Sequence, residues 1–218
     1  MGANTPEIHA VLFDFGGVFT ASPFDAAEAL GAELGAAPGR VLAIVFGPYH
    51  EDTNHPWHRL ERGEIPLAEA RDEIIALGRA EGLDTDPLRL FALLGRGEGA
   101  RAPMVERARR LLVRGYRTGL VTNNAREFRD AWRKLVPADE LFEVIVDSSE
   151  VGVRKPDPRI YELALARLGG VPPEQALFLD DFPSNVAAAE KLGMRGVLVR
   201  PDLTSALAAL DALLAEPR

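Results

Sequence analysis

The chain has 218 residues, of which 47% are hydrophobic and 27% are charged, and its formal net charge is −8. This composition is typical of a soluble protein that can bury one domain with a large insertion, or two domains. The acidic balance excludes a broad phosphate-neutralising surface, so no nucleic-acid partner is expected. The absence of cysteine excludes disulfides, thiolate catalysis and sulfur-ligated metals.

The first residues show no targeting signal, so the cytoplasm is the expected location. The first ten residues lack the basic and long apolar segments of a signal peptide, and Pro6 stands where a myristoylation signal has Ser or Thr. No apolar run approaches the roughly 18 residues that a membrane span needs, so no membrane association is expected. The amphipathic helical patterns suit either the core or a second subunit, which leaves a monomer and a homodimer both open.

Short apolar runs alternate with helical patterns along the chain. Nearly continuous apolar runs are typical of parallel strands buried on both faces, and the patterns between them have the spacing of crossover helices. The sequence therefore predicts an α/β fold with a doubly wound, Rossmann-like parallel sheet. The expected strands are 8–13, 118–121, 144–146, 176–179 and 196–199, and the expected helices of this part are 103–114, 125–136, 158–168, 184–192 and 204–215.

One gap breaks this alternation. About ninety residues separate the first strand from the helix at 103–114, too many for an ordinary crossover. The gap contains helical patterns at 24–34, 39–46, 67–81 and 88–94. We therefore expect an α/β core from residues 1–20 and 101–218, with an α-helical cap inserted at 21–100. The segment Gly95-Arg96-Gly97-Glu98-Gly99 is interpreted as a linker back to the core, because it follows a helix and not a strand.

Polar residues follow three of the expected strands directly. Asp14, Thr122 and Asp180 should meet at the carboxyl edge of the sheet, where open α/β sheets bind ligands. A fourth candidate, Lys155, lies in a loop further along the chain. Some of these residues also have a plainer interpretation: Asp14 as a turn former, the pair Asp180-Asp181 as a helix N-cap, and Lys155 as a solvated loop lysine. However, Lys155 is one of three lysines in an arginine-rich chain, and the ordered set is more specific than any member.

In order and spacing, these segments resemble the haloacid dehalogenase-like hydrolase superfamily over the whole chain. The resemblance implies that Asp14 is the nucleophile, that Thr122 and Lys155 bind phosphate, and that Asp180-Asp181 hold magnesium. An insertion between the first two motifs resembles the subgroup with an α-helical cap. Three shorter matches resemble the branch of bacterial glucose-1-phosphate phosphatases: Glu61-Arg62-Gly63-Glu64-Ile65, Arg154-Lys155-Pro156-Asp157, and Asp180-Asp181 followed by Asn185.

The expected activity is that of a Mg²⁺-dependent phosphatase. It would act on a small phosphorylated metabolite, with a sugar phosphate as one candidate, through an aspartyl-phosphate on Asp14. Asp14, the carbonyl of Gly16 and one of Asp180 and Asp181 suit the octahedral oxygen coordination of Mg²⁺. Phosphate oxygens would be bound by Thr122, Lys155 and the amides of the Gly16-Gly17 and Asn123-Asn124 loops.

Gly16 departs from the family pattern, since phosphatases of the superfamily commonly carry an acid/base aspartate there and glycine cannot transfer a proton. The alternatives are a metal-independent haloacid dehalogenase-type hydrolase, which the acidic pair disfavours, and a catalytically weak module that binds phosphate or a partner. A bound water or a cap residue such as His55, His58 or Glu64 could replace the missing acid.

A polar cluster in the cap has two interpretations. Pro56 is expected to interrupt any helix there, so the histidines share no face and a zinc site is disfavoured. A cap surface that contacts substrate is preferred, with Trp57, Arg62 and Glu64 as further candidates. The cluster comprises His50, Glu51, Asp52, His55 and His58.

Overall fold

The computed structural model describes residues 6–94 and 99–214, so most of the expected linker, at 95–98, lies outside the described residues. Five parallel strands form one sheet in the order β3-β2-β1-β4-β5. The order reverses between β1 and β4, which confirms the doubly wound α/β class. The strands are β1 (Ala10–Phe13), β2 (Arg117–Thr122), β3 (Val144–Asp147), β4 (Ala176–Asp180) and β5 (Arg195–Leu198).

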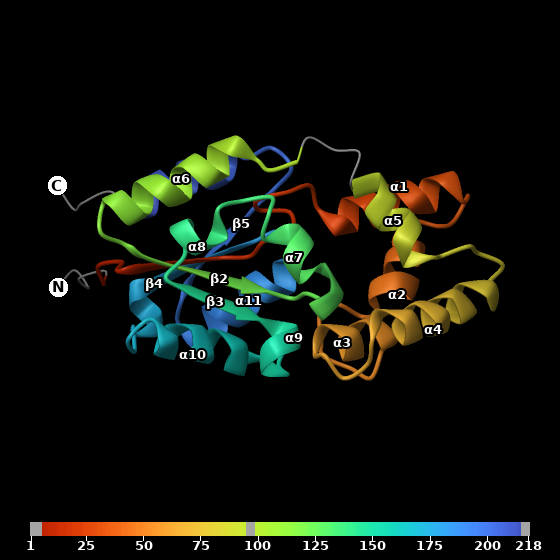
Figure 1. The fold of residues 1–218 in the computed structure, drawn as a ribbon. Helices are drawn as coiled ribbons and strands as arrows, with labels where there is room; N and C mark the ends of the chain where they lie inside the picture. The colour runs from red at the N-terminus through yellow and green to blue at the C-terminus, as the bar shows by residue number, and fades with distance from the viewer. Residues whose placement is uncertain (1–5, 95–98, 215–218) are drawn as a thin grey trace.

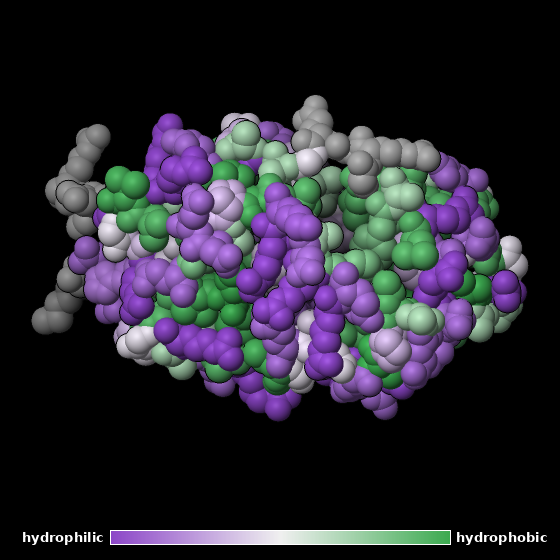
Figure 2. Space-filling model, viewed as in Figure 1, coloured by the Kyte–Doolittle hydropathy of each residue, from purple (hydrophilic) through white to green (hydrophobic). Residues whose placement is uncertain are grey.

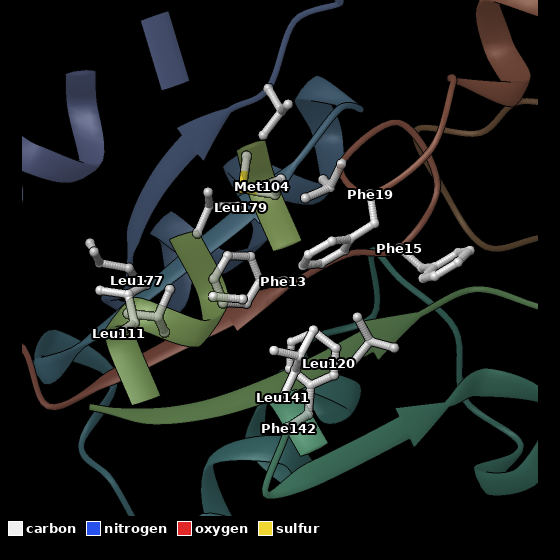
Figure 3. Packing of buried hydrophobic residues seen from close by; sticks show 14 of the residues in the cluster. Phe13, Phe15, Phe19, Met104, Leu111, Leu120, Leu141, Phe142, Leu177 and Leu179 are labelled. Atoms are coloured by element: carbon white, nitrogen blue, oxygen red, sulfur yellow. The ribbon is translucent and has the colours of Figure 1, made fainter. Parts of the chain in front are cut away.

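Helices cover both faces of the sheet because each strand is apolar on both sides (Figure 1). Val11 and Phe13 of β1 pack toward α6 (Ala102–Val113) and α12 (Thr204–Leu213) on one face. Ala10 and Leu12 pack toward α10 (Pro158–Arg167) and α11 (Pro183–Leu192) on the other. Figure 3 shows the first of these cores, where Phe13 lies among leucines of β2 and β4 and Phe142.

The prediction of one continuous helix at 125–136 is wrong. The chain instead forms a 3₁₀ turn η1 (Arg126–Phe128), one turn of helix α7 (Arg129–Trp132), and then α8 (Ala138–Leu141). Trp132 and Val136 are both buried in the core, which accounts for the helical spacing of apolar residues. Pro137 disfavours helical geometry at the residue before it, so the pattern does not propagate. Two further short elements are α9 (Ser148–Val151) and η2 (Pro173–Gln175).

A second group of helices lies beside the carboxyl ends of β2 and β3 (Figure 1). These helices share an apolar core that includes Leu30, Val45, Ile74 and Leu90, all at most 1% exposed. The Arg101 N–H donates to the Phe19 carbonyl (2.7 Å), so the two connections to the sheet run side by side. This contact supports the proposed division at residues 20 and 101. The helices are α1 (Pro23–Glu33), α2 (Arg40–Phe46), α3 (Pro56–Glu61), α4 (Leu67–Arg79) and α5 (Pro87–Leu94).

Helix α3 corrects the expectation that Pro56 interrupts any helix. Pro56 is instead the first residue of the helix, where its missing N–H is not needed. His55 caps this helix, because its Nδ1 accepts from the Trp57 N–H (3.2 Å). Across residues 6–94 and 99–214, none of the helices has the length and apolar character that crossing a membrane requires.

Candidate active site

Asp14 lies where β1 meets the topological switch point. Its backbone N–H donates to the Leu179 carbonyl of β4 (2.8 Å), which fixes the first residue of the loop against the neighbouring strand. Because β1 pairs with both β2 and β4, Thr122 and Asp180 lie at the same edge. All three residues are buried, with exposures of 8% for Asp14, 2% for Thr122 and 0% for Asp180. The structure thus brings together the strand-end residues that the sequence singled out.

Lys155 joins two of the carboxylates. Its Nζ lies 2.7 Å from Asp14 Oδ1 and 2.7 Å from Asp180 Oδ2, and its side chain is 1% exposed. Burial opposes the charged ammonium, but the two carboxylates outweigh it and raise the pKa of Lys155 above 10.5. Lys155 is therefore a permanent positive charge beside Asp14.

Asp180 has protein donors for both of its oxygens. Oδ1 accepts from the Phe182 N–H (2.7 Å), Oδ2 accepts from Lys155, and Asn185 Nδ2 lies 3.1 Å from each oxygen. These contacts fix Asp180 in the position that holds the Lys155 ammonium. Asp180 is thus satisfied within the protein.

Asp181 differs from Asp180. Its Oδ2 accepts from the Ser22 hydroxyl, but its Oδ1 is buried and has no hydrogen-bond partner among the described residues. Burial and the neighbouring carboxylates raise the pKa of Asp181 well above 3.8. Burial, opposed by Lys155, raises that of Asp14 to about 7. The single charge of Lys155 therefore does not balance the three carboxylates.

The three carboxylates fit a divalent cation. One oxygen from each of Asp14, Asp180 and Asp181 lies within 4.8 Å of the others, and oxygen ligands are those that Mg²⁺ prefers. Gly17 allows this arrangement: its φ is +69°, and a Cβ there would lie 1.9 Å from Asp181 Oδ2. Gly16 lines the adjoining cavity.

The loop after β2 serves two purposes. Thr122, Asn123 and Asn124 line the cavity above Asp14. The Asn123 side chain also brackets the backbone of Lys155, because Oδ1 accepts from its N–H (2.8 Å) and Nδ2 donates to its carbonyl (3.0 Å). The Asn124 N–H donates to Ser148 Oγ (3.0 Å) and the Gly17 N–H to the Ala21 carbonyl (3.4 Å), so these two expected phosphate donors have protein partners here.

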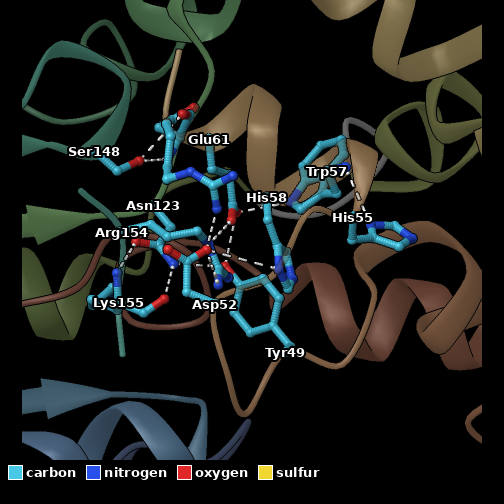
Figure 4. Close-up of polar contacts among 12 residues, drawn as sticks. Tyr49, Asp52, His55, Trp57, His58, Glu61, Asn123, Ser148, Arg154 and Lys155 are labelled. Carbon is cyan, nitrogen blue, oxygen red and sulfur yellow. Dashed lines mark hydrogen bonds and ion pairs between the residues drawn. The ribbon is translucent and has the colours of Figure 1, made fainter. Parts of the chain in front are cut away.

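A buried ion pair connects the cap to the segment between α9 and α10 that carries Lys155 (Figure 4). Glu61 Oε2 accepts from Arg154 Nε (2.7 Å), and Oε1 accepts from Tyr49 Oη (2.8 Å) and Trp57 Nε1 (2.8 Å). The Arg154 guanidinium carbon lies 4.6 Å from the centre of the Tyr49 ring. Tyr49 Oη in turn accepts from Asn123 Nδ2 (3.2 Å). Continuous polar contacts therefore run from the cap to the residue that positions Lys155.

The substrate-facing candidates of the cap divide into two groups. Trp57 lines the cavity, whereas Arg62 and Glu64 bind one another (2.6 Å) and are not among the described lining residues. His55 and His58 are also outside that lining. His58 is fully buried, and its Nδ1 accepts from the Thr53 N–H (3.0 Å).

These contacts bear on the zinc and acid hypotheses. Burial and Arg154 lower the pKa of His58 to about 3, so it stays neutral and is a poor proton donor. Within the described ranges, the carboxylates at 14, 180 and 181 form the only group suited to a metal, so the structure gives no support to a zinc site in the cap.

Sequence reasoning missed two residues of the site, Ser22 and Tyr49, and it did not predict that Arg154 is buried in an ion pair. Ser22 precedes Pro23 in the pattern of an N-cap, and it does accept from the Phe24 N–H (3.2 Å). Its contact with Asp181, however, spans 159 positions. The spacing of Trp57 and Glu61, four residues apart on a short helix, was the available signal for the cap network.

Comparison with known proteins agrees with this geometry. The sequence model of the haloacid dehalogenase-like hydrolases matches residues 8–193, and the chain belongs to this family of enzymes. It is 31% identical to mouse "Acyl-CoA dehydrogenase family member 10" over 95% of this chain and 19% of that protein. It is 38% identical to rat "Bifunctional epoxide hydrolase 2" over 50% of this chain and 20% of that protein. The chain thus spans about a fifth of these two relatives.

A third relative has a similar length: "Phosphatase MT3486" of Mycobacterium tuberculosis is 29% identical over 88% of this chain and 87% of that protein. Among solved structures, a HAD-like family hydrolase from Porphyromonas gingivalis superposes with a TM-score of 0.70 at 25% identity, covering 97% of this chain and all of the other (100%). A magnesium complex of a family enzyme from Bacteroides thetaiotaomicron gives 0.64 at 20% identity, covering 91% and 98%, and at that identity shows the fold alone.

Proposed function

We propose that this hydrolase is a Mg²⁺-dependent phosphatase that acts on a small phosphorylated metabolite through an aspartyl-phosphate on Asp14. The observation that carries the proposal is the unpartnered Oδ1 of Asp181, which lies beside a buried Asp14 that Lys155 holds in place. Relatives named phosphatases support it, including a "Glyceraldehyde 3-phosphate phosphatase" that is 35% identical over 98 residues.

The residues take distinct roles in this reaction. Asp14 attacks phosphorus, the bond to the leaving oxygen breaks, and water then attacks the phosphorus of the aspartyl-phosphate to release phosphate and restore Asp14. Lys155 neutralises charge on Asp14 and on the phosphoryl group, and Thr122 offers a hydroxyl at the same edge. Mg²⁺, when held by Asp14, Asp181 and the Gly16 carbonyl, would screen the repulsion between two anions. Asp180 positions Lys155.

The metal-independent dehalogenase is the competing function. Solved dehalogenases are among the structural relatives, at 22% identity, which is a likeness of fold. An acidic cluster with an unpartnered oxygen favours the phosphatase, because a buried carboxylate without a partner destabilises the fold unless a ligand satisfies it.

Phosphate release over a panel of phosphorylated sugars, nucleotides and cofactors, with Mg²⁺ and with excess chelator, tests the proposal. Phosphate release that requires Mg²⁺ supports it. Halide release from 2-chloropropionate in chelator would replace it with the dehalogenase function. Phosphate binding without turnover on any substrate would instead indicate the weak binding module.

A further inference from the structure

The cavity above Asp14 has an apolar wall. Its volume is about 440 Å³, and it extends from Asp14 and Thr122 at the sheet edge to the cap. In Figure 2 the surface is hollowed between α7 and α5, where hydrophobic residues gather. Eight aromatic residues of the cap and the core line it, among them Phe24, Phe46, Trp57, Phe91, Phe128 and Trp132.

The aromatic side chains form a continuous, fixed surface. The rings of Trp57 and Phe91 lie nearly parallel, 25° apart with centroids separated by 5.7 Å, and Phe91 lies 4.7 Å from Phe128. Trp57 is held in place because its Nε1 donates to Glu61. A preformed aromatic wall favours a flat apolar ligand, which gains ring contacts without reorganising the site.

Charged side chains line the cavity at two places, the sheet edge and the Glu61 carboxylate of the cap. Among the described lining residues, the charged side chains are Asp14, Asp181 and Glu61, and Glu61 already accepts from Tyr49, Trp57 and Arg154. A leaving group with a second anion would meet no cation among the described lining residues. The rings of Phe91 and Phe128 offer no hydrogen-bond partner to a leaving group rich in hydroxyls, and unpaired polar groups are costly once they are desolvated.

We infer that the substrate is a phosphate monoester of an uncharged phenol, whose ring packs against the wall formed by Trp57, Phe91 and Phe128. This inference rests on the proposed phosphatase function. Gly16 supports it independently: without an acid at that position the leaving oxygen receives little protonation, and an aryl oxide leaves more readily than an alkoxide. The O–P bond to Asp14 forms as the aryl O–P bond breaks, and one water completes hydrolysis to the free phenol and phosphate.

Inhibition by phosphonates separates recognition of the ring from leaving-group acidity. Acetyl phosphate serves as the reporter substrate, because it is reactive and carries no ring. Benzylphosphonate should inhibit at least about tenfold more strongly than methylphosphonate, since aromatic contacts and apolar burial add to the shared phosphoryl contacts. The Phe91→Ser variant should remove most of that ratio. Leu88→Ser, on the same helix but outside the described lining and 43% exposed, is the matched control and should keep it.

Leu135→Ser gives a second variant if Phe91→Ser does not fold, because Leu135 lines the cavity and is already 47% exposed. It should lower the ratio to a smaller extent. Equal inhibition by the two phosphonates, or a ratio that neither variant changes, would overturn the aromatic substrate while acetyl phosphate hydrolysis kept the phosphatase function intact. Failure of the wild type to hydrolyse acetyl phosphate in Mg²⁺ would overturn both.

Discussion

Two carboxylates of this enzyme, Glu61 in the cap and Asp181 at the sheet edge, have opposite surroundings. The oxygens of Glu61 accept from three protein donors. Asp181 is only half-buried, but its Oδ1 atom is buried and has no partner among the described residues. An unpaired buried polar atom destabilises the fold, so the proposed Mg²⁺ would satisfy Asp181 Oδ1, whereas the fully paired Glu61 suits a structural role.

The largest expected effect comes from the unpaired carboxylate. Removing Mg²⁺ with excess chelator should reduce phosphate release to background. Asp181→Asn should strongly weaken the binding of Mg²⁺, because few other carboxylates line the site. Millimolar Mg²⁺ should raise the melting temperature of the wild type, and by less in Asp181→Asn, since a ligand that binds the folded state stabilises it. Full activity in chelator would contradict this assignment.

Breaking the ion pair of Glu61 should destabilise the whole protein and not merely inactivate it. Arg154→Met leaves Glu61 buried without its cation, and such changes cost about 3–5 kcal/mol of unfolding free energy. Arg110→Met is the matched control, because Arg110 pairs with Glu106 on the exposed surface of α6, and surface pairs contribute about 1 kcal/mol or less. Urea denaturation measures both. Similar losses in the two variants would show that the Glu61 pair is not structural.

The effect at Gly16 is smaller and more specific. In the wild type, rates should rise steeply with the acidity of the leaving group, and aryl and acyl phosphates should react much faster than alkyl phosphates. Gly16→Asp adds an acid worth about a hundredfold on poor leaving groups and should flatten that dependence. The backbone permits the change: Gly16 lacks the positive φ of Gly17, and a Cβ would meet Pro23 Cδ at 3.4 Å. A wild type already insensitive to leaving-group acidity would contradict the prediction and indicate another acid.

Sequence alone predicted the sheet and its edge because those features depend on local patterns. Apolar runs fixed the strands, and parallel topology then placed Asp14 near Asp180 without any knowledge of side chains. The prediction of a helix over 125–136 failed because burial of Trp132 and Val136 produces helical spacing without a continuous helix. The cap network escaped prediction because Arg154 and Glu61 lie 93 positions apart, and no local pattern reports a contact of that range.

Phosphate release by Asp14→Asn tests the central claim most directly. Asn keeps the shape and most of the contacts of Asp14 but cannot form an aspartyl-phosphate, so the variant should melt like the wild type and show only background turnover in Mg²⁺. Asp157→Asn, at the half-buried N-cap of α10, is a matched carboxylate control that should retain activity. A folded Asp14→Asn enzyme with more than about a tenth of wild-type turnover would contradict covalent catalysis by Asp14.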